Sequence, residues 1–122
     1  MTASPTARTL QRCRKEGWRA HVVEKWIPQT HRRIDLFGFI DVLALDGEDG
    51  CLGIQATSTS NVSSRLHKSF TETREALIDW LRHGNRFEVW GWATRGPAGK
   101  RKLWTLKQVG VILDGDDLIR AD

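Results

Sequence analysis

Apolar residues recur along this chain at spacings that distinguish helices from strands. In the segment from Pro5 to Gly17, Leu10 and Cys13 are spaced for one buried helical face, and the terminal glycine is suited to end a helix. From about Val62 to His83 the apolar residues again recur close to the helical period, and a glycine follows. The buried stripe of this second predicted helix contains Val62, Leu66, Phe70, Leu77 and Leu81.

Other segments are rich in β-branched and aromatic residues or are almost continuously apolar, which predicts strands. These segments are Trp18–Trp26, Leu36–Leu45, Cys51–Thr57, Arg86–Ala93 and Leu103–Val111. The polar, glycine-containing stretch Asp46–Gly50 has the composition of a hairpin turn between the second and third of them. The order helix, three strands, helix, two strands predicts an α/β fold, with a central mixed β-sheet of about four to five strands flanked by helices.

Length and composition narrow the class of protein. The 122 residues fit one domain, so residues 1–122 are predicted to form a single unit. No apolar run reaches the roughly 18 residues that span a bilayer. Met1–Ala7 lacks the apolar stretch of a secretory signal, so we expect a cytoplasmic protein with no membrane partner. Cys13 and Cys51 have no metal-ligand spacing, which makes zinc and a disulfide framework improbable and favours two small buried residues.

Charge is unevenly distributed along the chain. The net charge is +4, residues 1–33 are strongly basic, and the segment after Val109 is acidic. A one-sided basic surface suits a polyanion, because neutralised phosphates release their counterions. DNA is therefore the expected partner, with RNA left open, and a merely solubilising surface is the alternative.

Two polar residues interrupt the apolar strands. Asp41 lies within the Leu36–Leu45 run, where an ionised carboxylate is costly unless a metal, a cation or several donors receive it. Gln55 faces Asp41 if the two strands pair through the predicted turn, and its amide oxygen and the Ala56 carbonyl are hard ligands suited to Mg²⁺ or Mn²⁺. The alternatives are an Asp paired with an arginine at a strand end and a buried Gln bonded to a neighbouring loop.

The segments Ile40-Asp41-Val42-Leu43-Ala44-Leu45 and Leu52-Gly53-Ile54-Gln55-Ala56-Thr57-Ser58 together resemble the core of the PD-(D/E)XK nuclease superfamily. The resemblance is to Holliday-junction-resolvase-like members and small phage-type proteins, and by element order it covers roughly Leu10 to Trp92. That core carries an Asp on one strand, an acidic residue on the next and a Lys two positions later. The resemblance implies a restriction-endonuclease-like core of order α-β-β-β-α-β-β.

Carried over by position, the resemblance assigns roles to individual residues. Asp41 matches the metal-binding Asp, Gln55 the second acidic position and Thr57 the Lys. Glu24 corresponds to an upstream carboxylate that some members use. Asp35 competes with Asp41 for the first Asp, although a turn-forming Asp is the slightly favoured interpretation.

The departures from the motif bear on catalysis. Gln55 removes one negative charge from the metal site, and Thr57 cannot supply the positive charge of the Lys. Arg65 and Lys68 are spaced to share one face of the second helix, so either could stabilise a phosphate in the transition state. A solvated basic face is the alternative.

Further residues are candidates for binding nucleic acid. Ser58, Ser60 and Asn61 either cap the second helix, which is the simpler expectation, or hold a phosphate oxygen. Basic residues in two loops could flank a nucleic-acid groove or simply be solvated: His31, Arg32, Arg33, Lys100, Arg101 and Lys102. Three tryptophans are expected in the core or on a sheet face rather than as base-stacking platforms: Trp90, Trp92 and Trp104.

The leading hypothesis is a nuclease that depends on Mg²⁺ or Mn²⁺ and hydrolyses DNA phosphodiester bonds, on duplex or branched DNA and compatible with a homodimer. The metal ligands would be Asp41, Gln55 and the Ala56 carbonyl, and the catalytic set would be Asp41, Gln55, Thr57, Lys68 and Glu24. The alternative is a catalytically inactive nuclease-fold protein that binds nucleic acid or regulates. A third hypothesis is a protein-binding module.

Overall fold

The computed structural model describes residues 3–122, so the first two residues of the polar segment Met1–Ala7 lie outside the described residues. The helices are α1 (Pro5–Lys15), the short 3-10 helix η1 (Thr59–Asn61), α2 (Val62–Thr71) and α3 (Arg74–Arg82). The strands are β1 (Arg19–Val22), β2 (Lys25–Ile27), β3 (Arg32–Ile34), β4 (Val42–Leu45), β5 (Leu52–Ser58), β6 (Arg86–Arg95), β7 (Leu103–Asp114) and β8 (Asp117–Ala121). Within this described range, no helix has the length and apolar character needed to cross a membrane.

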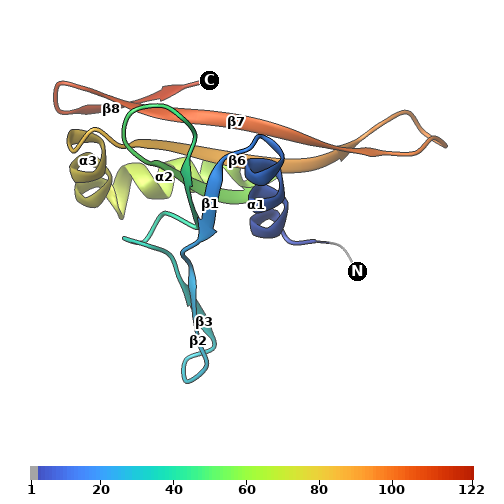
Figure 1. Cartoon of the computed structure of the whole chain (residues 1–122), viewed down its shortest axis with the longest axis horizontal. Coiled ribbons are helices and arrows are strands. Elements are labelled where there is room, and N and C mark those ends of the chain that lie inside the picture. The colour runs from blue at the N-terminus through green and yellow to red at the C-terminus, as the bar shows by residue number, and fades with distance from the viewer. Residues whose placement is uncertain (1–2) are drawn as a thin grey trace.

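A mixed six-stranded sheet organises the protein, with the strand order β1-β4-β5-β6-β7-β8 (Figure 1). Strands β5 and β6 are parallel, because η1, α2 and α3 form the connection between them, and the other pairs are antiparallel. Successive residues of a strand point to opposite faces, so Val89 and Trp90 of β6 enter different apolar clusters. The Trp90 cluster contains Cys13 of α1, and the Val89 cluster contains Leu66 of α2 and Leu77 of α3. The predicted α/β class with a mixed sheet flanked by helices is therefore confirmed.

Helix α1 begins and ends as its sequence predicts. The Ser4 hydroxyl accepts a hydrogen bond from the backbone N–H of Ala7 at 3.1 Å, which satisfies one free donor of the first turn. Beyond the last turn, Gly17 has a φ of +82°, a conformation that glycine adopts without steric cost. Cys13 is fully buried, as expected, whereas Cys51 is only half-buried, and both thiols are free.

The prediction of one strand from Trp18 to Trp26 is wrong, because the chain leaves the sheet after β1. Strand β1 pairs with β4 only over Arg19–Val22. The chain then forms the separate antiparallel pair β2–β3, which projects from the body as an arm (Figure 1). The basic residues of this segment, predicted to be a loop, therefore lie partly on a strand.

The apolar run Leu36–Leu45 is likewise not one strand. Its first half folds into a tight turn in which Leu36 bridges Ile40, and Phe37 and Gly38 have φ values of +55° and +86°. Regular pairing begins at β4, so Asp41 immediately precedes the strand instead of lying within it. The turn buries Phe39 and Ile40 but leaves Phe37 exposed, an arrangement that continuous hydrophobicity does not reveal.

The helix predicted from Val62 to His83 is two helices, α2 and α3. Hydroxyl groups near the break donate to backbone carbonyls, including Thr71 Oγ1 to His67 O at 2.8 Å and Ser69 Oγ to Leu66 O at 2.8 Å. Such bonds compete with the helical backbone ladder and commonly bend helices. Beyond this break the contacts change, since α2 packs against β5 and β6 and α3 packs against β6 and β7.

The C-terminal segment forms a hairpin, whereas its acidic composition had not indicated a further strand after Val111. Strand β7 continues past the predicted end at Val111 to Asp114, and β8 pairs with it after a turn at Gly115. The sheet therefore has six strands instead of about four to five. Asp116 in this turn forms an ion pair with Arg82 of α3 at 2.5 Å, so part of the acidic excess anchors the hairpin.

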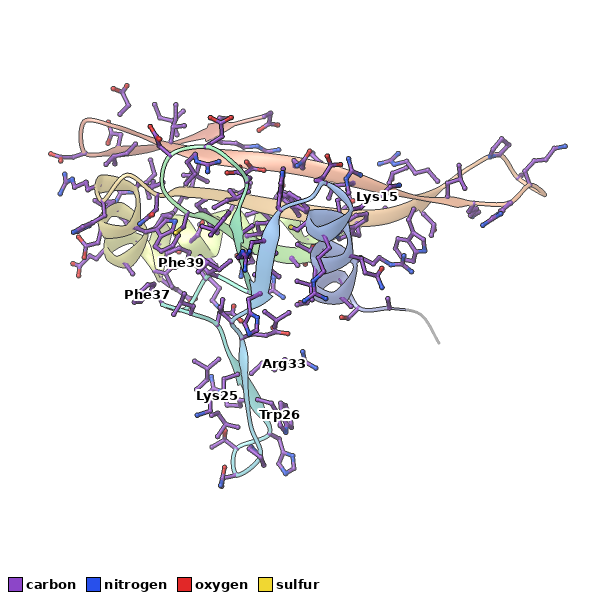
Figure 2. The ribbon with its side chains drawn as sticks, in the orientation of Figure 1. Lys15, Lys25, Trp26, Arg33, Phe37 and Phe39 are labelled. Carbon is purple, nitrogen blue, oxygen red and sulfur yellow. The ribbon has the colours of Figure 1, made fainter. Side chains whose placement is uncertain are left out.

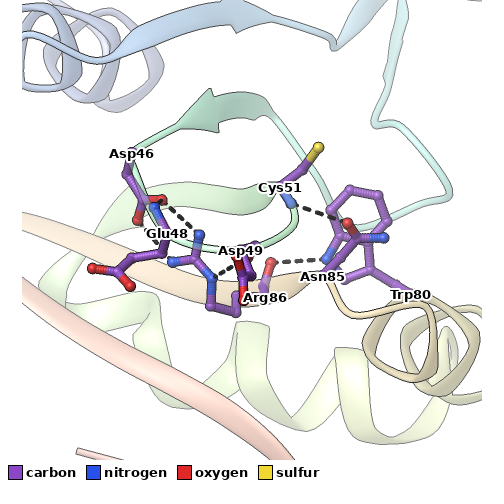
Figure 3. A network of polar contacts seen from close by, with 7 residues as sticks. All are labelled: Asp46, Glu48, Asp49, Cys51, Trp80, Asn85 and Arg86. Atoms are coloured by element: carbon purple, nitrogen blue, oxygen red, sulfur yellow. Dashed lines mark hydrogen bonds and ion pairs between the residues drawn. The ribbon is translucent and has the colours of Figure 1, made fainter.

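A polar network connects the β4–β5 turn to the start of β6 (Figure 3). Arg86 donates two hydrogen bonds to the Asp46 carboxylate, at 2.7 and 2.6 Å, and the Cys51 N–H donates to the Asn85 side chain at 3.0 Å. At Gly50 a Cβ atom would lie 2.0 Å from a backbone oxygen of the neighbouring segment, so only glycine fits there. These contacts fix the far end of the β4–β5 pair relative to the site described below.

Candidate active site

The pairing of β4 with β5 places Asp41 beside Gln55 and Ala56. The backbone N–H of Asp41 donates to the carbonyl of Ile54 at 2.9 Å. Its carboxylate Oδ2 accepts a hydrogen bond from the Ala56 N–H at 2.8 Å. Asp41 and Gln55 are buried, with 5% and 3% of their surfaces exposed, and both line the same cavity. The two residues singled out by the strand pattern thus lie together.

Three carboxylates converge at this point. Each of Glu24, Asp35 and Asp41 offers a ligand oxygen, and the three oxygens lie within 4.8 Å of one another. Glu24 lies in the linker between β1 and β2, not late in a strand as predicted, and Asp35 directly follows β3. The carbonyl of Asp35 also accepts a hydrogen bond from the Gly38 N–H at 3.0 Å. Asp35 is therefore both a turn residue and a neighbour of Asp41, so the two interpretations of it are compatible.

The electrostatics of the cluster are those of crowded acids. Burial raises the pKa of Asp41 well above its usual range, and the hydrogen bond with Asp35 and the charges of Asp35 and Glu24 raise it further. The Ala56 N–H acts in the opposite direction by stabilising the ionised carboxylate. Glu24 accepts a hydrogen bond from the Arg33 guanidinium at 2.7 Å. Arg33 therefore neutralises one member of the cluster, whereas Asp41 has no ion-pair partner among the described residues.

A polar cavity of about 480 Å³ surrounds these groups. One part of its wall carries the three carboxylates and another carries the basic residues Arg65 and Lys68 of α2. The full lining consists of Ser4, Pro5, Thr6, Glu24, Arg33, Asp35, Asp41, Gln55, Ala56, Thr57, Ser58, Asn61, Arg65 and Lys68. Because acidic and basic side chains line the same cavity, an anion and a cation can bind there side by side.

The segment from Ser58 to Asn61 does not cap α2 through its side chains, contrary to the simpler expectation. The chain enters α2 through the 3-10 helix η1, and the Asn61 side chain makes no capping hydrogen bond. Asn61 Nδ2 instead donates to Ser58 Oγ at 3.1 Å, and Ser58 and Ser60 share a hydrogen bond at 3.2 Å. Ser58 and Asn61 line the cavity, and Ser60 supports Ser58 from outside it.

Other candidates lie away from the cavity. Lys100 and Arg101 occupy the connection between β6 and β7, at the distant tip of that long hairpin (Figure 1). Trp90 and Trp92 are buried in the core as predicted. Trp104 lies on the sheet with 41% of its surface exposed, and the Arg8 guanidinium lies 3.5 Å from its ring centroid. We therefore separate these residues from the candidate site.

The donor set fits a hard divalent cation. Carboxylate oxygens are the ligands that Mg²⁺ and Mn²⁺ prefer, and a shared cation would offset the repulsion between the three acids. From its position in the sequence Asp35 is only a competing match for Asp41, because its closeness in space to Glu24 and Asp41 leaves no signal in the spacing along the chain. No protein-family model, curated protein or solved structure matches this chain.

Proposed function

We propose that this chain is a divalent-metal-dependent nuclease that hydrolyses DNA phosphodiester bonds, built on a restriction-endonuclease-like core. The observation that carries the proposal is the convergence of Glu24, Asp35 and Asp41 within 4.8 Å, in a cavity whose wall also carries Lys68 and Arg65. Clustered acids beside clustered bases are what a metal ion and a phosphate group require together.

In this proposal Asp41, Asp35 and Glu24 hold the metal, with the Gln55 amide oxygen and the Ala56 carbonyl as further donors. When bound, Mg²⁺ or Mn²⁺ supplies a water molecule of lowered pKa and neutralises charge on the scissile phosphate. Asp35 provides the negative charge that Gln55 does not carry. The apparent defect at the second acidic position of the motif is thus compensated from another segment of the chain.

The remaining residues of the cavity position the phosphate. Lys68 and Arg65 offer positive charge to the non-bridging oxygens, which takes over the electrostatic role that Thr57 cannot perform. The Thr57 hydroxyl can donate one neutral hydrogen bond. Arg33 holds Glu24 in place and adds a third cation to the lining of the cavity.

The test is cleavage of plasmid, single-stranded, branched and RNA substrates with Mg²⁺, Mn²⁺ or EDTA. We expect metal-dependent cleavage by the wild-type protein, and a rate lower by about 100-fold or more for Asp41→Asn and Asp35→Asn, because each removes a charged ligand. The matched control is Asp49→Asn, an exposed carboxylate in the β4–β5 turn outside the cavity, which should retain the wild-type rate.

Circular dichroism of each variant verifies the fold. Cleavage that survives Asp41→Asn, or that proceeds equally in EDTA, would contradict the proposal. The second candidate function is a nucleic-acid-binding protein without turnover, favoured by the uncharged Gln55 and Thr57 at the motif positions. Salt-sensitive binding with no cleavage under any metal would select this candidate.

A further inference from the structure

The β2–β3 arm has two different faces. Residues paired across an antiparallel ladder share one face, so Trp26 lies beside Arg33, and Lys25 lies beside Ile34 on the opposite face. Figure 2 shows Trp26 and Arg33 extending from one side of the arm and Lys25 from the other. The aromatic ring and the guanidinium are therefore neighbours on a single small surface.

Trp26 is an unusual residue for the surface of so small an element. With 49% of its surface exposed, it contacts the ring of His31 edge-to-face, at a centroid distance of 6.1 Å and an interplanar angle of 64°, and much of its indole remains open to solvent. The arm has no core of its own in which to bury such a side chain. An exposed aromatic ring of this kind gains free energy when a flat partner covers it.

The charge around Trp26 identifies the kind of partner. The segment from Lys25 to Ile34 carries Lys25, Arg32 and Arg33 and contains no acidic residue. An aromatic ring with a guanidinium beside it on the same face, as Arg33 lies beside Trp26, suits a nucleotide, because the ring stacks on the base while the cation attracts its phosphate. An acidic or purely apolar protein surface would use only one of these two features.

The position of Arg33 connects this surface to the candidate active site. Its guanidinium pairs with Glu24 and lines the cavity that contains Asp41. Trp26 is its cross-strand partner, and such partners have Cβ atoms about 5 Å apart. A base stacked on Trp26 would therefore lie close to Arg33, which lines the cavity of the candidate site.

We propose that Trp26 is a stacking platform for one unpaired base, which makes single-stranded or locally unpaired nucleic acid the substrate class of this protein. In a regular duplex both faces of a base are covered by its neighbours, so only an unpaired or unstacked base can present a face to the indole. The inference rests on the proposed function in assuming that the bound strand is then cleaved. Binding of the base to Trp26 does not depend on cleavage.

The experiment measures binding in EDTA, where no metal-dependent cleavage can occur. Fluorescence anisotropy is recorded for a labelled single-stranded oligonucleotide and for the blunt duplex of the same sequence. We expect Trp26→Ala to weaken single-strand binding by roughly 10-fold or more, the contribution of one base–aromatic stack, and duplex binding by less than about 2-fold. Trp26→Phe should restore most of the affinity.

Ile34→Ala is the matched control, because Ile34 is exposed to 55% on the opposite face of the same arm and should leave both affinities unchanged. Irradiation of the wild-type protein with a strand containing 5-iodouracil should also crosslink Trp26. The proposal would be overturned if Trp26→Ala lost equal affinity for single strand and duplex, or if Ile34→Ala had an equal effect. It would also be overturned if Trp26→Ala altered the oligomeric state without a binding defect, or if no crosslink formed at Trp26. Absence of cleavage would affect only the nuclease function.

Discussion

The two ends of strand β4 carry the same residue type in opposite circumstances. Asp46, just after the strand, receives two hydrogen bonds from Arg86 at 2.7 and 2.6 Å, and these lower its pKa. Asp41, just before the strand, lies with Asp35 and Glu24, and burial and the neighbouring acids raise its pKa. One carboxylate is therefore fully paired, whereas the other is held in a charge cluster that a cation would relieve.

This difference separates stabilisation from function within one strand pair. At the Asp46 end, a bidentate ion pair and the bonds from Cys51 and Trp80 tie the β4–β5 turn to β6 and α3 (Figure 3). At the Asp41 end the fold holds acids together without full compensation, which lowers stability in the absence of ligand. Natural sites often sacrifice stability in this way to keep a binding geometry in place.

The largest change in the free energy of unfolding should come from a divalent cation bound at the Asp41 end of β4. Mg²⁺ at about 100 times its dissociation constant should raise the free energy of unfolding of the wild-type protein by about 2.7 kcal/mol, because it binds only the folded cluster. Asp41→Asn should abolish this increase, and above about pH 8, where the raised pKa of Asp41 lets its buried carboxyl ionise, it should also stabilise the metal-free protein by removing that charge. Urea denaturation in EDTA and in Mg²⁺ measures both changes.

Asp46→Asn provides the control for that measurement, because its site lies at the opposite end of the strand. It should retain the full Mg²⁺-dependent increase. An increase that persists in Asp41→Asn, or that disappears in Asp46→Asn, would show that the two ends do not differ as described.

The next effect concerns the paired end and its dependence on pH. Asp46→Asn should lower the free energy of unfolding at pH 7 by about 1–2 kcal/mol, a value that allows for solvent screening of the partly exposed Arg86. The pKa of Asp46 is lower in the folded protein than its ordinary value of 3.8. The contribution is therefore complete above that value and is lost as the pH falls through the folded-state pKa.

Urea denaturation of wild type and Asp46→Asn from pH 7 down to pH 2 tests this prediction. The stability difference should be constant in the upper range and should close at the acidic end. A difference that instead grows as the pH falls would mean that Asp46 contributes something other than an ionised acceptor for Arg86.

The smallest change in stability should come from restoring the second acidic residue of the motif, at Gln55, near the Asp41 end of β4. Gln55→Glu adds a fourth acid to the cavity, so it should destabilise the metal-free protein by about 1 kcal/mol through repulsion. The same charge should tighten Mg²⁺ binding by roughly 10-fold. Titration of the thermal midpoint with Mg²⁺ measures the affinity, and Gln108→Glu on the exposed surface of β7 is the matched control. Equal responses of the two variants would place Gln55 outside the metal environment.

Parts of the fold follow directly from local pattern. The α1 helix is predictable because a capping serine, a buried stripe and a terminal glycine agree with one another. The β4–β5 pair is predictable because two apolar segments flank a polar turn. The helix break near Thr71 and the turn at Phe37 are not, since hydroxyl–carbonyl bonds and a left-handed backbone override an apolar periodicity that continues across both.

The candidate site shows the same division between local and long-range information. The pairing of two apolar segments across a polar turn is a local property, and it suffices to bring Asp41 near Gln55 and Ala56. Asp35, Glu24 and Arg33 reach that position only because the chain leaves the sheet after β1, forms the arm and returns through a tight turn. Contacts between such segments depend on how the turns orient them in space, and residue spacing along the chain does not encode that orientation.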